Sequence, residues 1–191
     1  VVYNGFDFRA PPSRTDGAEV RRELGVPPDA PLIGSIARLE EQKGYELMIE
    51  AMRYILPALP AAHLVVAGGG SKAADLAGLV RNLGLGDRVH LTGWRNDAPR
   101  LLAAFDLFAL TSDTEQMPLS VIEAMASGLP VVATDVGDVR TMLSAENAPY
   151  VRAQDDGVEI VALDPRDERR CGQLRHRRLD AEGREVARHG L

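Results

Sequence analysis

Short apolar stretches alternate with stretches of helical periodicity along most of this chain, and this alternation restricts the possible folds more than any other feature. The apolar stretches cover residues 32–36, 63–67, 88–91, 107–110 and 131–133. Between them, apolar residues recur about every three to four positions over residues 45–55, 72–83, 98–104 and 119–127. Parallel strands have to be joined by a crossover, which is usually a helix. The pattern therefore predicts an α/β fold, a Rossmann-like doubly wound parallel sheet with helices on both faces.

Composition limits the classes of function. The 191 residues are enough for one well-packed domain. No apolar run approaches the roughly 20 residues that cross a bilayer, and we expect a soluble, cytoplasmic protein. The net charge of −6 argues against general binding of nucleic acid. Cys171 is the only cysteine and the four histidines are scattered, so neither a disulfide framework nor a metal site is expected.

Two glutamates mark the entrance to the helix expected over residues 119–127. Glu115 lies in the loop before this helix, and Glu123 lies one to two turns inside it. The first turn of a helix leaves backbone N–H groups without acceptors, so an anion can be held there, with Glu115 facing the same ligand. Apolar residues flank Glu123, and a carboxylate on a largely buried helix needs a partner.

Two cations follow the first apolar stretch. Arg38 and Lys43 stand five positions apart in the loop after residues 32–36. Arginine offers a planar fork of donors and lysine a point charge, so the two side chains can converge on one diphosphate. The alternative is a solvated loop in which they pair with Glu40 and Glu41. Because Arg38 and Lys43 occur together with Glu115 and Glu123 in one ordered set of motifs, we favour the interpretation that they bind a ligand.

These motifs together resemble a known family. Glu115-x7-Glu123, the run Glu-Ala-Met-Ala-Ser-Gly and the stretch Pro-Val-Val-Ala-Thr occur in order, and Arg38-x4-Lys43-Gly44 precedes them. They resemble the motifs of group 1, family-4 retaining glycosyltransferases, which have the two-domain GT-B architecture. The resemblance implies that the chain is the C-terminal, donor-binding half of such an enzyme. The reaction would move a sugar from a nucleotide diphosphate sugar to an acceptor hydroxyl with retention of configuration.

The resemblance also assigns roles to residues. Arg38, Lys43 and Glu115 would be the catalytic residues, the two cations on the departing diphosphate and the glutamate on the donor sugar. Glu123 would accept hydrogen bonds from the ribose. The other donor-binding residues would be Gly68, Gly70, Trp94, Arg95, Met117, Pro118, Leu119 and Ser120. Neither a metal nor another cofactor is expected, because fixed cations supply the counter-charge.

Two of these assignments have alternatives. Residues 68–73 also satisfy Gly-x-Gly-x-x-Ala, the dinucleotide fingerprint, but no acidic residue ends the next apolar stretch, which argues against a nicotinamide site. The two glycines either admit a nucleotide or form a plain tight turn. Trp94 either stacks on a base or caps the core.

Residues 1–165 are expected to form the donor-binding domain, and residues 166–191 a divergent, arginine-rich, poorly ordered tail. The acceptor site would belong to an N-terminal domain outside this chain, so the chain alone should bind a donor without turnover. Any membrane association would be peripheral and made by that domain. Gln116 and the segment after Gly137 depart from the family pattern, which bears on the choice of sugar. The alternatives are a non-catalytic nucleotide-binding module and a GT-B-like sugar-nucleotide epimerase.

Overall fold

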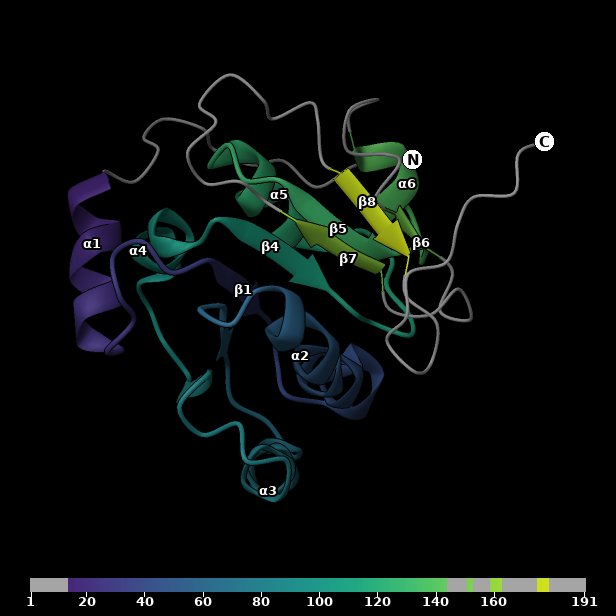
Figure 1. Ribbon diagram of the computed structural model, residues 1–191. Helices are drawn as coiled ribbons and strands as arrows, with labels where there is room; N and C mark the ends of the chain where they lie inside the picture. Colours follow the sequence, from purple (N-terminus) through teal and green to yellow (C-terminus); the bar gives the residue numbers. More distant parts are fainter. Residues whose placement is uncertain (1–13, 144–150, 153–158, 163–174, 179–191) are drawn as a thin grey trace.

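A parallel sheet lies at the centre of the molecule, as the alternation of the sequence predicts (Figure 1). The computed structural model describes residues 14–143, 151–152, 159–162 and 175–178. The sheet has six strands in the order β3-β2-β1-β4-β5-β6, and all its pairings are parallel. Its strands are β1 (Leu32–Ile36), β2 (His63–Ala67), β3 (Val89–Gly93), β4 (Leu107–Leu110), β5 (Val131–Thr134) and β6 (Val151–Arg152).

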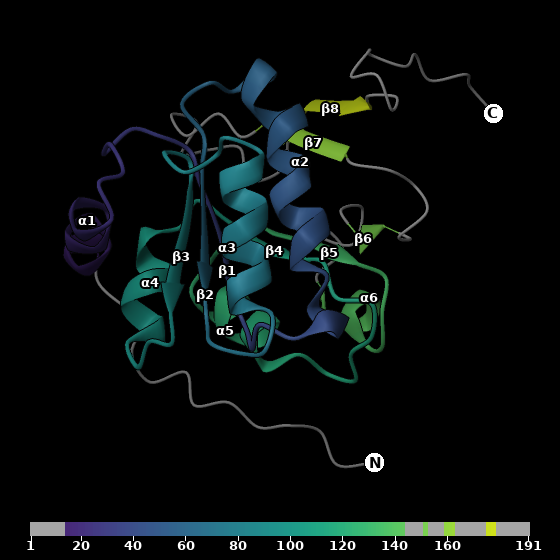
Figure 2. The same cartoon turned by 90° about the horizontal axis from the view of Figure 1, so that it is seen from below.

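Helices cover both faces of this sheet, which confirms the doubly wound architecture. They are α1 (Arg14–Glu23), the short 3-10 helix η1 (Glu41–Lys43), α2 (Tyr45–Ala58), α3 (Ala73–Asn82), α4 (Ala98–Ala104), α5 (Leu119–Ala126) and α6 (Val139–Met142). Helices α2 and α3 lie side by side on one face (Figure 2). Helices α4, α5 and α6 pack on the other face, and α1 packs against α4.

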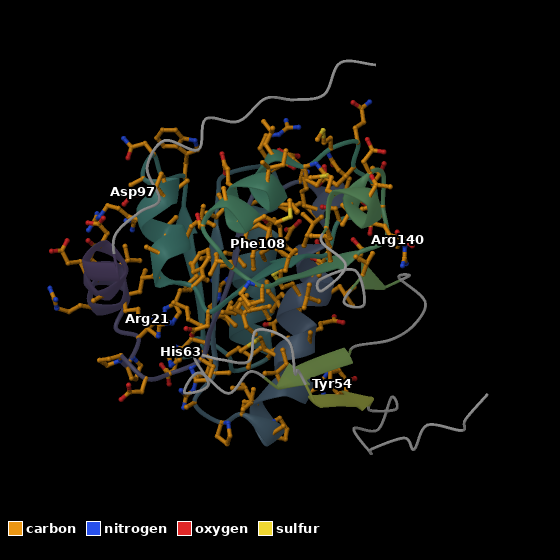
Figure 3. All side chains as sticks on the ribbon, turned by 90° about the horizontal axis from the view of Figure 1, so that it is seen from above. Arg21, Tyr54, His63, Asp97, Phe108 and Arg140 are labelled. Carbon is orange, nitrogen blue, oxygen red and sulfur yellow. The ribbon has the colours of Figure 1, made fainter. Side chains whose placement is uncertain are left out.

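The core is divided by the sheet into two apolar clusters. In β2, Val65 and Ala67 belong to the cluster under α4 and α5, whereas Leu64 and Val66 belong to the cluster under α2 and α3. Successive side chains of a strand point to opposite faces, so a strand covered on both sides is apolar throughout. Phe108 of β4 is fully buried in the middle of the molecule (Figure 3).

Most of the expected elements are confirmed, and two boundaries are corrected. Strands β1, β2 and β4 and helix α4 occupy the expected residues. Helix α2 does not end before Pro57 but continues to Ala58. The proline lies in the last turn, where it removes a single backbone hydrogen bond, and Leu56 and Leu59 pack against the α2–α3 cluster. Strand β3 runs to Gly93 because the backbone of Gly68 extends the pairing, its N–H donating to the Gly93 carbonyl at 2.9 Å.

Helix α1 was not expected from the sequence, and Arg21 fastens it to the domain. The Arg21 guanidinium donates to the carbonyls of Ala104 at 2.9 Å and Ala30 at 2.7 Å, and it pairs with Asp106 at 2.7 Å. The N–H of Leu32, at the start of β1, donates to the same Asp106 oxygen, Oδ2, at 2.7 Å. One arginine therefore connects α1 to the end of α4 and to the starts of two central strands.

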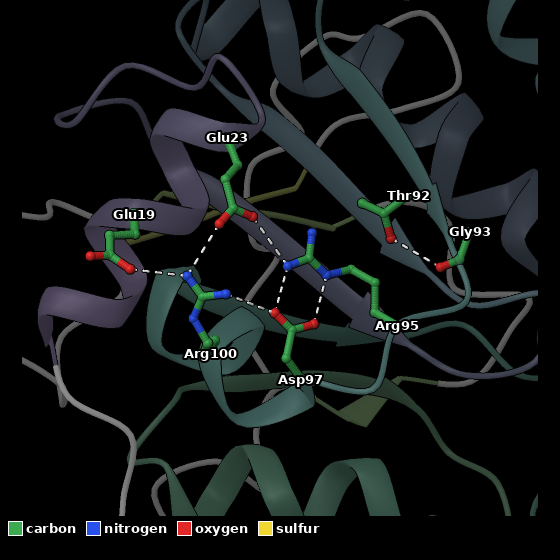
Figure 4. A network of polar contacts seen from close by, with 7 residues as sticks. All are labelled: Glu19, Glu23, Thr92, Gly93, Arg95, Asp97 and Arg100. Atoms are coloured by element: carbon green, nitrogen blue, oxygen red, sulfur yellow. Dashed lines mark hydrogen bonds and ion pairs between the residues drawn. The ribbon is translucent and has the colours of Figure 1, made fainter.

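Ionic contacts add a second connection between α1 and α4. Arg100 of α4 pairs with Glu19 and Glu23 of α1, both at 3.1 Å (Figure 4). Arg95, in the loop before α4, pairs with Glu23 at 3.2 Å and with Asp97 at 2.6 Å. These contacts fix the loop that follows β3 against the outer helix.

Two further strands form a separate antiparallel pair. They are β7 (Glu159–Ala162), inside the expected donor-binding domain, and β8 (Arg175–Arg178), inside the expected tail. The rest of that tail lies outside the described residues, so the division at residue 165 stays a prediction. Among the described residues, no helix is long and apolar enough to cross a bilayer.

Candidate functional site

The candidate site lies at the carboxyl edge of the sheet, where the strand order reverses. Strands β1 and β4 are neighbours, but the chain leaves β1 toward α2 on one face and leaves β4 toward α5 on the other. The carboxyl ends of these two strands are therefore the switch point of the sheet, which is the usual ligand position in doubly wound folds. The loop after β1 carries Arg38 and Lys43, and the loop after β4 carries Glu115.

Lys43 and Glu115 meet at this point. The Lys43 Nζ atom donates to Glu115 Oε1 at 2.5 Å, and the side chains are 16% and 11% exposed. The expected alternative, in which Lys43 pairs with Glu40 or Glu41, is wrong. The Glu40 carboxylate instead accepts hydrogen bonds from the hydroxyl and N–H of Ser71, which hold its pKa below the usual range.

Ser112 is a second residue that fixes the Glu115 carboxylate, and the sequence reasoning missed it. Its hydroxyl donates to the same Oε1 atom at 2.7 Å, and its own carbonyl accepts the hydroxyl of Thr134 at 2.6 Å. Both Ser112 and Thr134 are buried. The signal in the sequence was a serine two residues beyond a strand at the carboxyl edge, which by itself is too common to single out.

Hydrogen bonds to the carbonyls of the first loop also hold the two loops together. The Thr111 hydroxyl donates to the Lys43 carbonyl at 3.2 Å, and the Asp113 N–H donates to the Gln42 carbonyl at 2.9 Å. Tyr45 is buried close by, and its hydroxyl accepts from Ser35 at 3.4 Å. Burial, followed by the nearby charge of Glu115, raises the pKa of Tyr45 to about 12, so this hydroxyl stays protonated near neutral pH.

Gly137 and Asp138 support the Glu115 loop, although the segment that they begin departs from the family pattern. A Cβ atom on Gly137 would come within 2.4 Å of the carbonyl oxygens of Glu115 and Gln116. The Asp138 N–H donates to the Gln116 carbonyl at 2.8 Å. Only glycine allows this close approach, so Gly137 sets the position of the Glu115–Gln116 backbone.

Arg38 is exposed, and no described residue forms a hydrogen bond or an ion pair with its guanidinium. Its backbone is nonetheless well placed, because the flanking Ala37 and Leu39 N–H groups donate to the carbonyls of Ala67 at 3.2 Å and Gly69 at 2.9 Å. The Arg38 side chain is therefore an exposed cation on a well-fixed backbone at the carboxyl edge of the sheet, where an anion can reach it.

Gly68 and Gly70 are required by the packing of the chain itself. A Cβ on Gly68 would meet the Ala37 carbonyl oxygen at 1.8 Å, and one on Gly70 would meet the Leu39 carbonyl oxygen at 2.3 Å. The glycine-rich turn thus lies directly against the Arg38 loop. This contact accounts for both glycines without a ligand, as the tight-turn alternative supposed, and places the turn beside the proposed phosphate-binding cation.

Helix α5 begins at Leu119, with Pro118 as its N-cap and Met117 before it. In the described part of the chain, the N–H groups of Leu119 and Ser120 have no acceptor. Leu119 is 49% exposed, so the helix entrance is open to solvent. These N–H groups carry the positive end of the helix dipole and can receive an anion.

Glu123 is half-buried on α5, and its carboxylate has no hydrogen-bond or ion-pair partner among the described residues. Burial raises its pKa above the ordinary value, because the charged form loses contact with water. The described residues therefore do not provide the partner that we expect for this carboxylate.

Trp94 and Arg95 behave differently from each other. Trp94 is 76% exposed, which excludes a role as a cap of the core. The Arg95 guanidinium is bound to both oxygens of Asp97, at 2.7 and 2.6 Å, and to Glu23 (Figure 4). These carboxylates raise its pKa, and they hold the Arg95 side chain in the α1–α4 contact. Across the described ranges, no group of three or more His, Cys, Asp or Glu side chains could hold a metal ion.

Comparison with known proteins places the chain in a family. A model described as "Glycosyl transferases group 1" matches residues 16–173. The chain is 32% identical over 163 residues to the lipopolysaccharide core biosynthesis mannosyltransferase LpsB of Rhizobium meliloti, covering 82% of this chain and 46% of that protein. It is 31% identical over 150 residues to an alpha-1,3-galactosyltransferase of Escherichia coli that uses UDP-Gal, covering 76% and 39%. It thus spans less than half the length of these relatives.

Solved structures agree with the sequence comparison. The crystal structure of HepE from Anabaena in complex with UDP and glucose has a TM-score of 0.69 and 32% identity, and the match covers 76% of this chain and 40% of HepE. WaaG, a glycosyltransferase of lipopolysaccharide biosynthesis, has a TM-score of 0.58 and 28% identity, with 64% and 33% covered. These structural neighbours are GT-B glycosyltransferases. Fold, motifs and the extent of the family match agree, and the chain belongs to the group 1 glycosyl transferases.

Proposed function

We propose that this chain is the C-terminal, donor-binding half of a family-4 retaining glycosyltransferase of GT-B architecture. The observation that carries the proposal is the contact of Lys43 with Glu115, made by two loops 72 positions apart at the reversal of the strand order. The same edge of the sheet holds the exposed guanidinium of Arg38 and the first N–H groups of α5, which have no acceptor among the described residues. Retention of configuration rests on the Glu-x7-Glu resemblance.

The reaction needs stabilisation of a departing nucleoside diphosphate, on which negative charge builds as the sugar leaves. Arg38 and Lys43 would bind its phosphates, together with the N–H groups at the start of α5 near Met117, Pro118, Leu119 and Ser120. Fixed donors and cations aimed at developing charge need no rearrangement during the reaction, so we propose that no metal ion or other cofactor takes part.

The rest of the donor would extend along the same edge of the sheet. Glu123, the half-buried carboxylate without a partner among the described residues, would accept hydrogen bonds from the ribose. The glycine-rich turn at Gly68 and Gly70 and the exposed ring of Trp94 would border the nucleobase. Arg95 would contribute through its backbone, because its guanidinium is bound to Asp97.

The substrates are proposed from the relatives. HepE has been solved with UDP and with UDP-glucose, and LpsB is named a mannosyltransferase. A nucleoside diphosphate sugar is therefore the proposed donor. The acceptor site is proposed to lie in an N-terminal domain outside this chain, which would also make any peripheral membrane contact in the cytoplasm. The chain alone would then bind a donor without transferring its sugar.

The two alternative functions are not favoured. The proteins compared above are glycosyltransferases, and none of them is an epimerase or a binding module without activity. The chain departs from the family pattern at Gln116 and after Gly137. Arg38, Lys43 and Glu115 are nevertheless all present in the loops at the carboxyl edge of the sheet.

Calorimetry tests this proposal. The chain is titrated with UDP, GDP and ADP in the presence of a chelator, and one of them is expected to bind. Arg38→Ala should weaken that binding by roughly 1.5–3 kcal/mol, the scale of hydrogen bonds to charged groups. Arg53→Ala, which removes an exposed cation from α2, is the matched control and should leave the affinity unchanged. A folded chain that binds none of the three compounds, or an Arg38→Ala variant of full affinity, would contradict the assigned site.

A further inference from the structure

The two oxygens of Glu115 have different surroundings. Oε1 accepts from both Lys43 Nζ, at 2.5 Å, and Ser112 Oγ, at 2.7 Å. Among the described residues, no donor contacts Oε2. Two donors on one oxygen fix the plane of the carboxylate and leave the second oxygen available to a ligand hydroxyl.

The same contact changes the charge that a phosphate meets. Lys43 and Glu115 are both largely shielded from solvent and together carry no net charge. A phosphate that approaches the Lys43 ammonium is also repelled by the carboxylate attached to it, and this repulsion is poorly screened where water is excluded.

The repulsion depends on what the diphosphate carries. The terminal phosphate of a bare nucleoside diphosphate loses a second proton with a pKa of about 6, so it is close to a dianion near neutral pH. In a nucleotide sugar the same phosphate is esterified and carries one charge fewer. The sugar also brings hydroxyl groups that can donate to Oε2. A carboxylate at this position therefore opposes the bare diphosphate more than the sugar conjugate.

We propose that Glu115, bound to Lys43 and positioned by Ser112, makes the site discriminate against the bare nucleoside diphosphate and in favour of its sugar conjugate. The inference rests on the proposed function and extends it. Glu115 acts here as a specificity residue, through the negative charge that it places beside Lys43 and through the Oε2 atom that it offers to the sugar. Discrimination of this kind favours the loading of substrate and the release of the diphosphate product.

The experiment measures the dissociation constants of UDP and UDP-glucose for wild type and Glu115→Gln at pH 7.5. Glutamine keeps the size and an acceptor oxygen but removes the charge. UDP should bind roughly three- to tenfold more tightly to the variant, and the preference for UDP-glucose over UDP should fall by at least about threefold. Glu41→Gln, which removes an exposed charge two residues from Lys43, is the matched control for net charge. It should change that preference less than about twofold.

The outcomes separate this inference from the proposed function. An unchanged or weaker UDP affinity in Glu115→Gln, or an unchanged preference, overturns the inference while the proposed function stands. A wild-type chain that binds neither compound overturns the proposed function and this inference together. If thermal unfolding shows that Glu115→Gln is not folded, Glu115→Ala takes its place with the same expected shift, because it also removes the charge beside Lys43.

Discussion

Glu123 lowers the stability of the fold, and it is also the residue proposed to bind the ribose. Its carboxylate is half-buried on α5, without a hydrogen-bond or ion-pair partner in the described part of the chain, and burial raises its pKa. An acid with a raised pKa in the folded state destabilises the fold at a pH where it is ionised, and this cost disappears as pH falls below the ordinary value of 4.5. A residue that lowers stability and could bind a ligand is typical of a functional site.

We therefore expect Glu123→Gln to have opposite effects on stability and binding. At pH 7.5 the unliganded variant should gain roughly 0.5 kcal/mol in free energy of unfolding, a small amount because the carboxylate keeps some contact with water. Nucleoside diphosphate affinity should fall. Urea denaturation at pH 7.5 and pH 4 measures the first effect, which should vanish at pH 4, and calorimetry measures the second. Glu50→Gln, on the exposed side of α2, should change neither.

At the scale of elements, a pair of histidines joins the starts of β2 and β3. His63 Nδ1 and His90 Nε2 are 2.9 Å apart with stacked rings, and Arg88 lies 3.1 Å from His63 Nε2. Arginine can only donate, so Nε2 of His63 accepts, and its Nδ1–H donates to His90. This arrangement requires a neutral His63. Burial first, and then the charges of His90, Arg88 and Arg21, lower the pKa of His63 to about 4.

The lowered pKa of His63 predicts that the free energy of unfolding depends on pH. Because the folded pKa of His63 lies below the unfolded value of 6.5, its contribution is fully present above about pH 6.5 and is lost as pH falls toward about 4. Between pH 7.5 and 4.5 wild type should lose about 2 kcal/mol more free energy of unfolding than His63→Gln, whose amide can still accept from Arg88 and donate to His90. Urea denaturation across this range measures the difference. Parallel pH curves for the two proteins would show that His63 is not held neutral.

At the scale of the whole molecule, α1 is an outer helix that long-range polar contacts tie to the domain. Arg21 is 11% exposed, and its partners lie as far as 85 positions away in the sequence. It connects the outer helix, the end of α4 and the entry to the central strands, so its loss should loosen several elements together.

Arg21→Met should lower the free energy of unfolding by about 2–3 kcal/mol, since it removes hydrogen bonds from a charged donor to carbonyl groups and leaves Asp106 with the Leu32 N–H alone. Arg22→Met, the same change at the exposed neighbouring position, should cost less than about 0.5 kcal/mol. Urea denaturation compares the two variants. If both variants lost the same free energy of unfolding, the Arg21 contacts would contribute little to the packing of α1 on the domain.

Local pattern was sufficient to determine most elements of the sheet. Strands β1, β2 and β4 and helix α4 were predicted with their bounds, because alternation and helical periodicity are set by neighbours along the chain. The spacing of Arg38, Lys43, Glu115 and Glu123 similarly identified the loops of the candidate site. The elements outside this periodic region, such as α1 and β6, gave too short or too polar a pattern to be predicted.

Only the tertiary structure decided which of these residues touch. The pairing of Lys43 with Glu115 exists because β1 and β4 are neighbours at the point where the strand order reverses, which no local pattern encodes. The contact of Arg95 with Glu23 is likewise a result of packing, since α1 packs against α4. Secondary structure depends on interactions a few residues apart, whereas contacts across the sheet depend on how whole elements pack. The sequence by itself thus determined the fold class and the charged loops, and the packing of the elements decided their partners.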